Sequence, residues 1–238
     1  MPDILAIATA SLRNNLRELD SISRNTANMN TQGYKSEVYL DRGFQAQLAA
    51  AGAATAASNT DNTGVVRDLA PGPLKFTGSS LTLAIEGKGF FQLDTPQGVV
   101  LTRNGQFRLD ANGRLVSSDG WPVLMKGGDI QLDNSDFKVL GDGTLRAGQN
   151  QQTQLDVVEA DPAALQDLGG GRYRAAVTSE PEPGDFRVRQ GYLEQSNVDS
   201  LTQMTSLMST LRSAGAAQQV VHAYDEIIDN AISTLGQF

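Results

Sequence analysis

The chain has 238 residues, a formal net charge of −8, no cysteine and one histidine. The missing cysteines exclude a disulfide framework, a cysteine nucleophile and a thiolate metal site, and a single histidine excludes a metal site built on several histidines. The acidic balance gives no general attraction for phosphate backbones, so no nucleic-acid partner is expected.

Residues 1–33 have the pattern of a helix. Apolar or small residues recur at spacings of three and four, and Asn15 interrupts the series. Such spacing keeps one narrow seam facing a partner helix. Gly33 predicts the end of this helix, because glycine tolerates the left-handed conformation of a C-terminal cap.

The same N-terminal stretch lacks the basic region and the apolar core of a secretory signal. No segment of the chain approaches the roughly 18 apolar residues of a membrane-spanning helix. We therefore expect neither a cleaved signal peptide nor membrane insertion.

Residues 34–75 carry little pattern, and Ala, Gly, Thr, Asn and Ser dominate residues 49–64. This composition predicts an extended linker with little core of its own.

Residues 76–190 change to short apolar runs separated by glycine turns every seven to nine residues. Asn104-Gly105, Asn112-Gly113 and Asp119-Gly120 are dipeptides typical of β-hairpins, because both of their residues accept positive φ. The spacing predicts an antiparallel meander, open or barrel-like.

Residues 191–238 return to helical spacing, with a 3,4 rhythm sustained for about four heptads. Ser196-Asn197 is the expected N-cap. A helix with such a seam is not stable alone. The two terminal helices must therefore pack on each other or on neighbouring copies, or stay disordered.

The sequence thus predicts an α+β fold. Terminal helices (1–33 and 191–238) form a coiled-coil assembly domain, and a linker (34–75) leads into a central all-β antiparallel domain (76–190). The residues expected at the assembly interface are Leu5, Leu12, Leu19, Ile22, Met29, Val198, Leu207, Leu211, Val221, Ile228, Ile232 and Leu235.

No motif in the chain indicates catalysis. His222 has no second element of a site, and the glycine-rich pieces lack the spacing of a phosphate-binding loop. Asp129, Asp133, Asp136 and Asp142 alternate with turn residues, where aspartate commonly serves local hydrogen bonding. We expect no catalytic residue, cofactor, metal or small-molecule substrate.

Four separate motifs resemble flagellar basal-body rod and hook proteins. Residues 22–35 (ISRNTANMNTQGYK) are similar to the family's N-terminal signature, with departures at Arg24 and Thr26. Residues 71–91 and 102–115 are similar to the start and the next hairpins of its β-domain, and residues 191–199 (GYLEQSNVD) resemble the opening of its C-terminal helix. The motif residues are Asn25, Ala27, Asn28, Asn30, Thr31, Gly33 and Tyr34 in the first segment and Leu193, Glu194, Ser196, Asn197, Val198 and Asp199 in the last.

The resemblance implies a non-enzymatic rod subunit that crosses the periplasm in the flagellar basal body. It implies export by the flagellar type III apparatus with an uncleaved N-terminus, and partners that are other copies and other rod subunits. In the family the terminal helices line the tube and the β-domain forms its outer layer. The length and residues 127–130 and 142–145 resemble the proximal rod type, which is favoured. Residues 71–91 look more like the distal rod type, which is the alternative within the family.

One departure bears on the neighbours of the C-terminal helix. Family members often carry Arg-x-Tyr/Phe-Glu there, whereas Arg212 is followed by Ser213, Ala214 and Gly215. From another class, an exported β-rich glycan-binding module with trimerising coiled-coil ends is the alternative.

Overall fold

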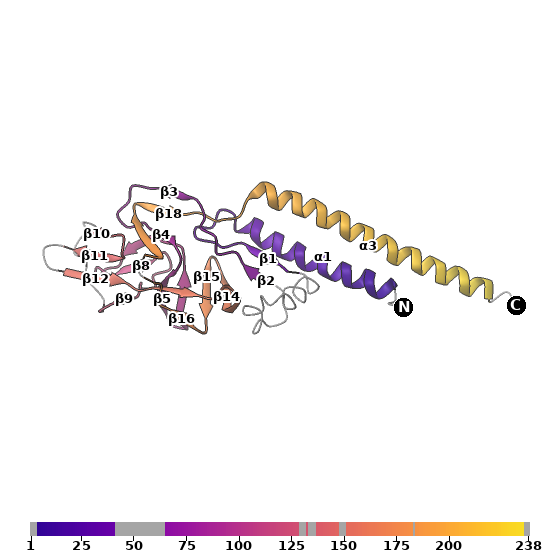
Figure 1. Ribbon diagram of the computed structural model, residues 1–238, viewed down its shortest axis with the longest axis horizontal. Helices are drawn as coiled ribbons and strands as arrows, with labels where there is room; N and C mark the ends of the chain where they lie inside the picture. The colour runs from indigo at the N-terminus through magenta and orange to yellow at the C-terminus, as the bar shows by residue number, and fades with distance from the viewer. Residues whose placement is uncertain are drawn as a thin grey trace.

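The computed structural model describes residues 4–40, 65–128, 132, 137–147, 151–182 and 184–235. They form a pair of helices and a β-domain that lie end to end (Figure 1). Helix α1 (Ile4–Ala27) and helix α3 (Ser200–Leu235) lie side by side. They run antiparallel, since Asn25 meets Gln203 and Asn15 meets Ser213. Of the three possibilities left open by the sequence, the structure shows the helices packed on each other.

The contact between the helices combines apolar residues of α1 with small residues of α3. Ala8 and Ile22 of α1 are buried. Opposite them, Thr210, Ala214 and Ala217 of α3 are buried too. Small side chains let two helix backbones approach closely, so α3 presents its small residues to α1 and turns several large ones outward.

Asn15, which interrupts the apolar series of α1, is buried in this contact. Its amide donates a hydrogen bond to Ser213 Oγ of α3 over 3.2 Å. A buried polar group of this kind specifies register between paired helices. The interruption seen in the sequence is therefore a point of alignment between the two helices.

Helix α1 ends earlier than the sequence pattern predicts. It stops at Ala27, where the side chain of Asn28 donates to the Arg24 carbonyl over 2.9 Å. Gly33 lies beyond the helix with φ 68°, and a Cβ atom there would stand 2.4 Å from the carbonyl carbon of Arg103. The expected role of Gly33 as the helix stop is wrong, because this glycine instead allows the chain to press against the β-domain.

The strands are short. In chain order they are β1 (Glu37–Tyr39), β2 (Val65–Arg67), β3 (Leu74–Phe76), β4 (Leu83–Gly87), β5 (Phe90–Thr95), β6 (Gly98–Thr102), β7 (Phe107–Leu109), β8 (Leu115–Ser117), β9 (Met125–Lys126), β10 (Phe137–Val139), β11 (Thr144–Ala147), β12 (Gln151–Leu155), β13 (Val157–Ala160), β14 (Leu165–Gly169), β15 (Arg172–Ala175), β16 (Thr178–Ser179), β17 (Phe186–Gln190) and β18 (Tyr192–Glu194). A 3₁₀ turn, η1 (Pro162–Ala164), precedes β14.

The strand pairs are antiparallel, as expected, but the path is not a simple meander. Neighbouring strands pair in β5–β6, β7–β8, β10–β11–β12 and β14–β15. Distant strands also pair: the six-stranded sheet has the order β14-β15-β6-β5-β13-β16, and β17 pairs with β4. The even spacing of turns shows where strands end but carries no information on these distant pairings.

Two apolar clusters form the core of the β-domain. The larger is centred on Leu83, Ile85 and Phe91, and the rings of Phe91 and Phe107 meet edge to face with centroids 5.3 Å apart. The smaller cluster contains Phe90 and Leu101 and reaches Tyr173. The overall α+β character, with a mostly β central domain, is confirmed.

The segment before α3 is a strand and an extended connection. Strand β18 pairs with β3, and α3 begins only at Ser200. The Thr202 backbone N–H donates to Asp199 Oδ2 over 3.0 Å, so Asp199 caps the helix in place of the expected Ser196-Asn197.

Candidate functional site

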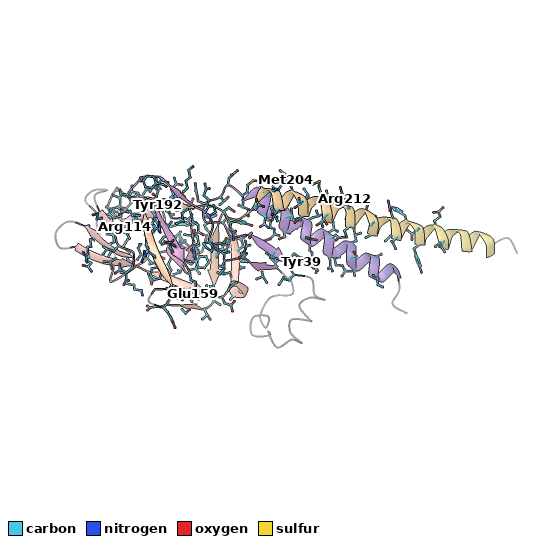
Figure 2. The ribbon with its side chains drawn as sticks, turned by 45° about the horizontal axis from the view of Figure 1, so that its top comes forward. Tyr39, Arg114, Glu159, Tyr192, Met204 and Arg212 are labelled. Atoms are coloured by element: carbon cyan, nitrogen blue, oxygen red, sulfur yellow. The ribbon has the colours of Figure 1, made fainter. Side chains whose placement is uncertain are left out.

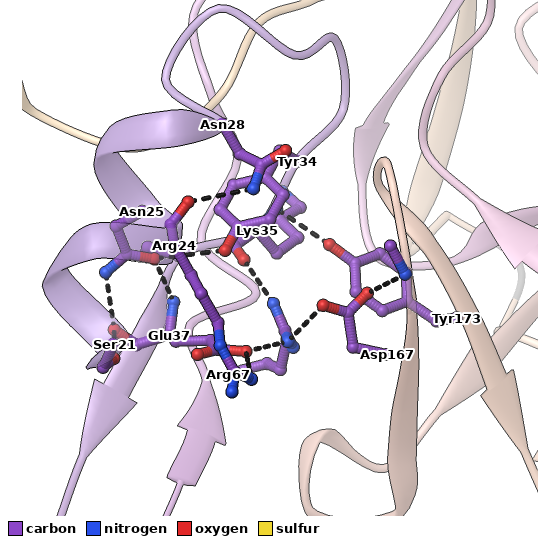
Figure 3. Close-up of polar contacts among 12 residues, drawn as sticks. Ser21, Arg24, Asn25, Asn28, Tyr34, Lys35, Glu37, Arg67, Asp167 and Tyr173 are labelled. Atoms are coloured by element: carbon purple, nitrogen blue, oxygen red, sulfur yellow. Dashed lines mark hydrogen bonds and ion pairs between the residues drawn. The ribbon is translucent and has the colours of Figure 1, made fainter. Parts of the chain in front are cut away.

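The two motif segments from opposite ends of the chain meet between the helix pair and the β-domain. Figure 3 shows the side of this region that holds Asn25, Arg67 and Tyr173. We call this region the junction. It consists of Asn25, Tyr34, Lys35, Glu37, Arg67, Arg103, Asp167, Tyr173, Glu194 and Asn197. The backbones also join directly, since the Gly33 N–H donates to the Glu194 carbonyl over 2.9 Å. The junction is where the chain ends become one body with the β-domain.

Asn25 ties α1 to the strand that follows it and to α3. Its Oδ1 accepts from the Glu37 backbone N–H over 2.8 Å and from Tyr34 Oη over 3.3 Å. Its Nδ2 donates to the Glu37 carbonyl over 2.8 Å and to Gln203 Oε1 over 3.3 Å. The amide therefore uses both its donor and its acceptor atoms inside the protein, which fixes its orientation.

Glu194, at the end of β18, accepts from two buried cations. Lys35 Nζ lies 2.7 Å from Oε1, and Arg103 Nη1 lies 3.2 Å from Oε2. The side chains of Lys35, Arg103 and Glu194 are 1%, 2% and 0% exposed. Burial disfavours the charged forms and lowers the pKa of Lys35 and of Arg103, although the Glu194 carboxylate acts in the opposite direction.

Further contacts add hydrogen bonds to this group, although Arg103 Nε is buried without a hydrogen-bond partner. The Gly72 N–H donates to Glu194 Oε1 over 2.9 Å, and Lys35 Nζ donates to the Ala70 carbonyl over 2.7 Å. The guanidinium of Arg103 donates to the carbonyls of Ile85 and Gly87. Buried charges are tolerated when they are paired and hydrogen-bonded in this way.

Arg67 forms a second buried ionic group with Glu37 and Asp167. It pairs with Glu37, and its Nη2 lies 2.9 Å from Asp167 Oδ2. Its guanidinium carbon lies 5.7 Å from the ring centroid of Tyr34 and 5.3 Å from that of Tyr173, within range of cation–π attraction. Burial raises the pKa of both tyrosines, and Tyr173 Oη accepts from the Lys35 backbone N–H over 3.0 Å.

The charges of the junction balance. Three buried cations (Lys35, Arg67, Arg103) face three carboxylates (Glu37, Asp167, Glu194). At the edge of this group the exposed Arg24 also lies 3.7 Å from Glu37 Oε1. These groups are committed to one another, so the arrangement is suited to holding parts of the chain together. Among the described residues, no cluster of three or more His, Cys, Asp or Glu side chains could hold a metal ion.

The motif residues predicted from the sequence have different places in the structure. Asn25, Gly33, Tyr34, Glu194 and Asn197 meet at the junction, where Asn197 Oδ1 accepts from the Ser36 N–H over 2.8 Å. Asn28 and Thr31 form the turn after α1, and Leu193 and Ser196 are buried beside the junction while Asp199 caps α3. Ala27 and Asn30 are exposed, and Val198 is half-buried.

The expected assembly residues are not all in the contact between the helices. Ile22 is buried, and Leu12, Leu19, Met29 and Val221 are half-buried, Met29 lying in the turn after α1. Leu207 and Leu211 are 38% and 53% exposed. The side chains of Leu5, Ile228, Ile232 and Leu235 lie outside the described part of the molecule.

Several junction residues were missed by sequence reasoning. Glu37 and Arg67 lie in the segment expected to be a plain linker, and Asp167 and Tyr173 lie in unremarkable strands. Lys35 and Arg103 were not singled out either, although they stand inside stretches that resemble the family. A single sequence does not distinguish a buried charged residue from an exposed one, since burial depends on the tertiary partner.

The sequence matches two family descriptions of flagellar proteins. Residues 84–147 match "Flagellar hook protein FlgE/F/G D1 domain" and residues 189–234 match "Flagellar basal body rod FlgEFG protein C-terminal". Neither described helix is long and apolar enough to span a membrane.

Relatives match over nearly their whole lengths. The chain is 32% identical to flagellar basal-body rod protein FlgF of Mesorhizobium japonicum, with 99% of each chain covered. It is 33% identical to FlgF of Rhizobium meliloti, with 92% of each covered, and 30% identical to FlgG of Bacillus subtilis, with 94% of this chain and 96% of the relative covered.

Proposed function

The chain belongs to the family of flagellar hook and basal-body rod proteins, and we propose that it polymerises through its terminal helices into the tubular rod. It is a structural subunit of the flagellar basal-body rod and not an enzyme. Polymerisation through the terminal helices is the part that we propose.

The observation that carries the proposal is the surface of α3. Leu201, Met204, Met208 and Leu211 are each more than half exposed, and Leu207 is 38% exposed. Apolar surface of this kind on a helix marks a contact with another protein. Each such side chain buried on assembly contributes roughly 1.5–3 kcal/mol before the cost of ordering.

We further propose the proximal rod as the place of this chain, with the distal rod as the alternative. The similarity to FlgF relatives at 32–33% identity supports this assignment, while FlgG relatives reach 31%. The partners are other copies and other rod subunits. Export uses the flagellar type III apparatus without a cleaved signal peptide.

The test is complementation of a strain that lacks the gene. A variant that lacks residues 200–238, and with them α3, is expected to restore no swimming and to be absent from isolated basal bodies, because the assembly surface is gone. Val177→Ser, at a 75% exposed position of the β-domain, is the control that restores both. Swimming supported by the truncated chain contradicts the proposal, as does a full-length chain that sediments as a stable trimer.

A further inference from the structure

Helix α3 carries two exposed surfaces of opposite shape, at different levels along its length. The first, here named the stripe, consists of Leu201, Met204, Met208 and Leu211, which are 70%, 57%, 54% and 53% exposed. Their spacing of three, four and three residues places large side chains in one row. Met204, labelled in Figure 2, lies on the part of α3 next to the β-domain.

The second surface, here named the groove, is a hollow of about 330 Å³ between α1 and α3. Small residues dominate its lining, which includes Ala8, Ser11, Ser213, Ala216, Ala217 and Val220. Ala217 is buried against α1, whereas Ala216 is exposed in the groove. The groove therefore offers room for an apolar side chain from outside the molecule.

The stripe and the groove face different directions. At about 100° per residue, the stripe and the α3 residues of the groove lie about 150° apart around the helix axis. At about 1.5 Å per residue, their centres are about 15 Å apart along the axis. One copy of the chain cannot bring its own stripe into its own groove, but two parallel copies can when one is shifted along the axis.

Charge supports a protein partner for this part of α3. From Ser200 to Val221 the helix has one charged residue, Arg212, although charged residues make up 19% of the chain. Depletion of charge is characteristic of the buried centre of protein interfaces. Beyond Val221 the helix becomes acidic, with Asp225, Glu226 and Asp229.

We propose that the stripe of one copy docks into the groove of a second copy of this chain. The proposal rests on the function proposed above and adds the partner and the two surfaces. Because the surfaces differ, the contact is heterologous, and repetition with an axial shift produces an open helical array rather than a closed two-fold dimer. The large side chains supply the volume that the small residues of the groove leave empty.

The absence of cysteine makes the test direct. Two tagged forms are produced in the same cells, one with Met208→Cys and the other with Ala216→Cys, and isolated basal bodies are treated with a short bismaleimide. We expect a cross-linked product that carries both tags, at least tenfold more abundant than with either form alone. The matched control replaces Ala216→Cys by Gln218→Cys, which is exposed at the level of the groove but lies about 160° from Ala216 around the axis of α3.

Three results overturn the inference while leaving the proposed function intact. They are basal bodies that contain the chain without the cross-link, a cross-link equally strong with Gln218→Cys, and a Met208→Cys product formed only with itself or with a different rod protein. Basal bodies that lack the chain altogether contradict the proposed function instead.

A second variant fills the groove. Ala216→Phe, at an exposed position, is expected to lower the amount of chain in basal bodies at least tenfold while the thermal unfolding midpoint stays unchanged. Gln218→Phe, on the side of α3 away from the groove, is the control that assembles normally. Normal assembly of Ala216→Phe overturns the proposal.

Discussion

Glu194 is the residue that connects both ends of the chain to the β-domain. Its carboxylate is fully buried and faces Lys35 and Arg103. When the acceptor of such a group is removed, buried cations remain without compensation, which is far more costly than loss of an exposed pair. The loss of stability on substituting Glu194 therefore measures how much the junction contributes to the free energy of unfolding.

Glu194→Gln is expected to lower the free energy of unfolding by about 3–5 kcal/mol, as measured by urea denaturation. The control is Glu86→Gln, which breaks the exposed pair with Arg189, whose side chains are 47% and 42% exposed. That loss is expected to stay below about 1 kcal/mol. Equal losses in the two variants would show that the buried group contributes no more than a surface pair.

The buried phenol of Tyr173 gives the junction a dependence on alkaline pH. Its pKa is raised by burial above the ordinary value of 10.0. The stability that this group contributes is present below pH 10 and is lost as the pH rises through the folded pKa, since the unfolded chain ionises first. We expect the advantage of the wild type over Tyr173→Phe to fall by up to about 1.4 kcal/mol per pH unit above pH 10.

The comparison between these two proteins also removes the contribution of Lys35. The pKa of Lys35 is lowered, so its own contribution rises with pH up to the ordinary value of 10.5 and is common to both proteins. The measurement is denaturant unfolding from pH 9 to 11.5. A constant difference across that range would contradict the buried, protonated phenol.

At the scale of elements, the contact between α1 and α3 depends on small side chains. Ala217 is 8% exposed and faces α1, whereas Ala223 is exposed on the same helix. Ala217→Leu is expected to lower the free energy of unfolding by about 1–3 kcal/mol, because the added atoms force the helices apart. Ala223→Leu is expected to change stability by less than about 0.5 kcal/mol, as a surface substitution does. Thermal unfolding followed by helical circular dichroism checks both variants, and similar midpoints would refute close packing at Ala217.

The elements also show what a single sequence can and cannot predict. The helical spacing of residues 1–33 and 191–238 identified both helices. Asn112-Gly113 and Asp119-Gly120 located turns of the β-domain, where Gly113 and Gly120 have φ of 77° and 88°. The hairpin expected at Asn104-Gly105 is wrong, because β6 and β7 do not pair with each other and Gly105 does not have a positive φ. Strand β18 escaped notice because its partner β3 lies more than a hundred residues earlier in the chain. Leu207 and Leu211 follow the correct period, but period alone does not say whether a face packs on α1 or outward.

The junction residues were predictable only where they stand in segments that resemble the family. Asn25, Tyr34 and Glu194 stand in motifs of the family, whereas Arg67 and Asp167 stand in segments with no pattern. Their roles arise from three-dimensional proximity, since Arg67 and Asp167 are 100 residues apart in the chain.

At the scale of the whole molecule, the junction is expected to hold the helix pair at a fixed angle to the β-domain. Spin labels at Val177→Cys and Gln219→Cys report the distance between the two bodies by pulsed electron resonance. We expect a narrow distribution that broadens in Asn25→Ala, because this change removes all four hydrogen bonds of the amide. Asn30→Ala, at an exposed motif position, is the control that stays narrow. A broad distribution in the otherwise unchanged chain would contradict a fixed angle.

The pairing of Lys35 with Glu194 has a consequence for the order of events in folding. The two residues are 159 positions apart in the sequence. Their contact therefore closes a long loop of the chain, and contacts between residues so far apart form slowly. Whichever end of the polypeptide emerges first from a narrow passage, the pair cannot close until the other end has also emerged. Arrival of the final segment thus sets the moment at which the subunit becomes rigid.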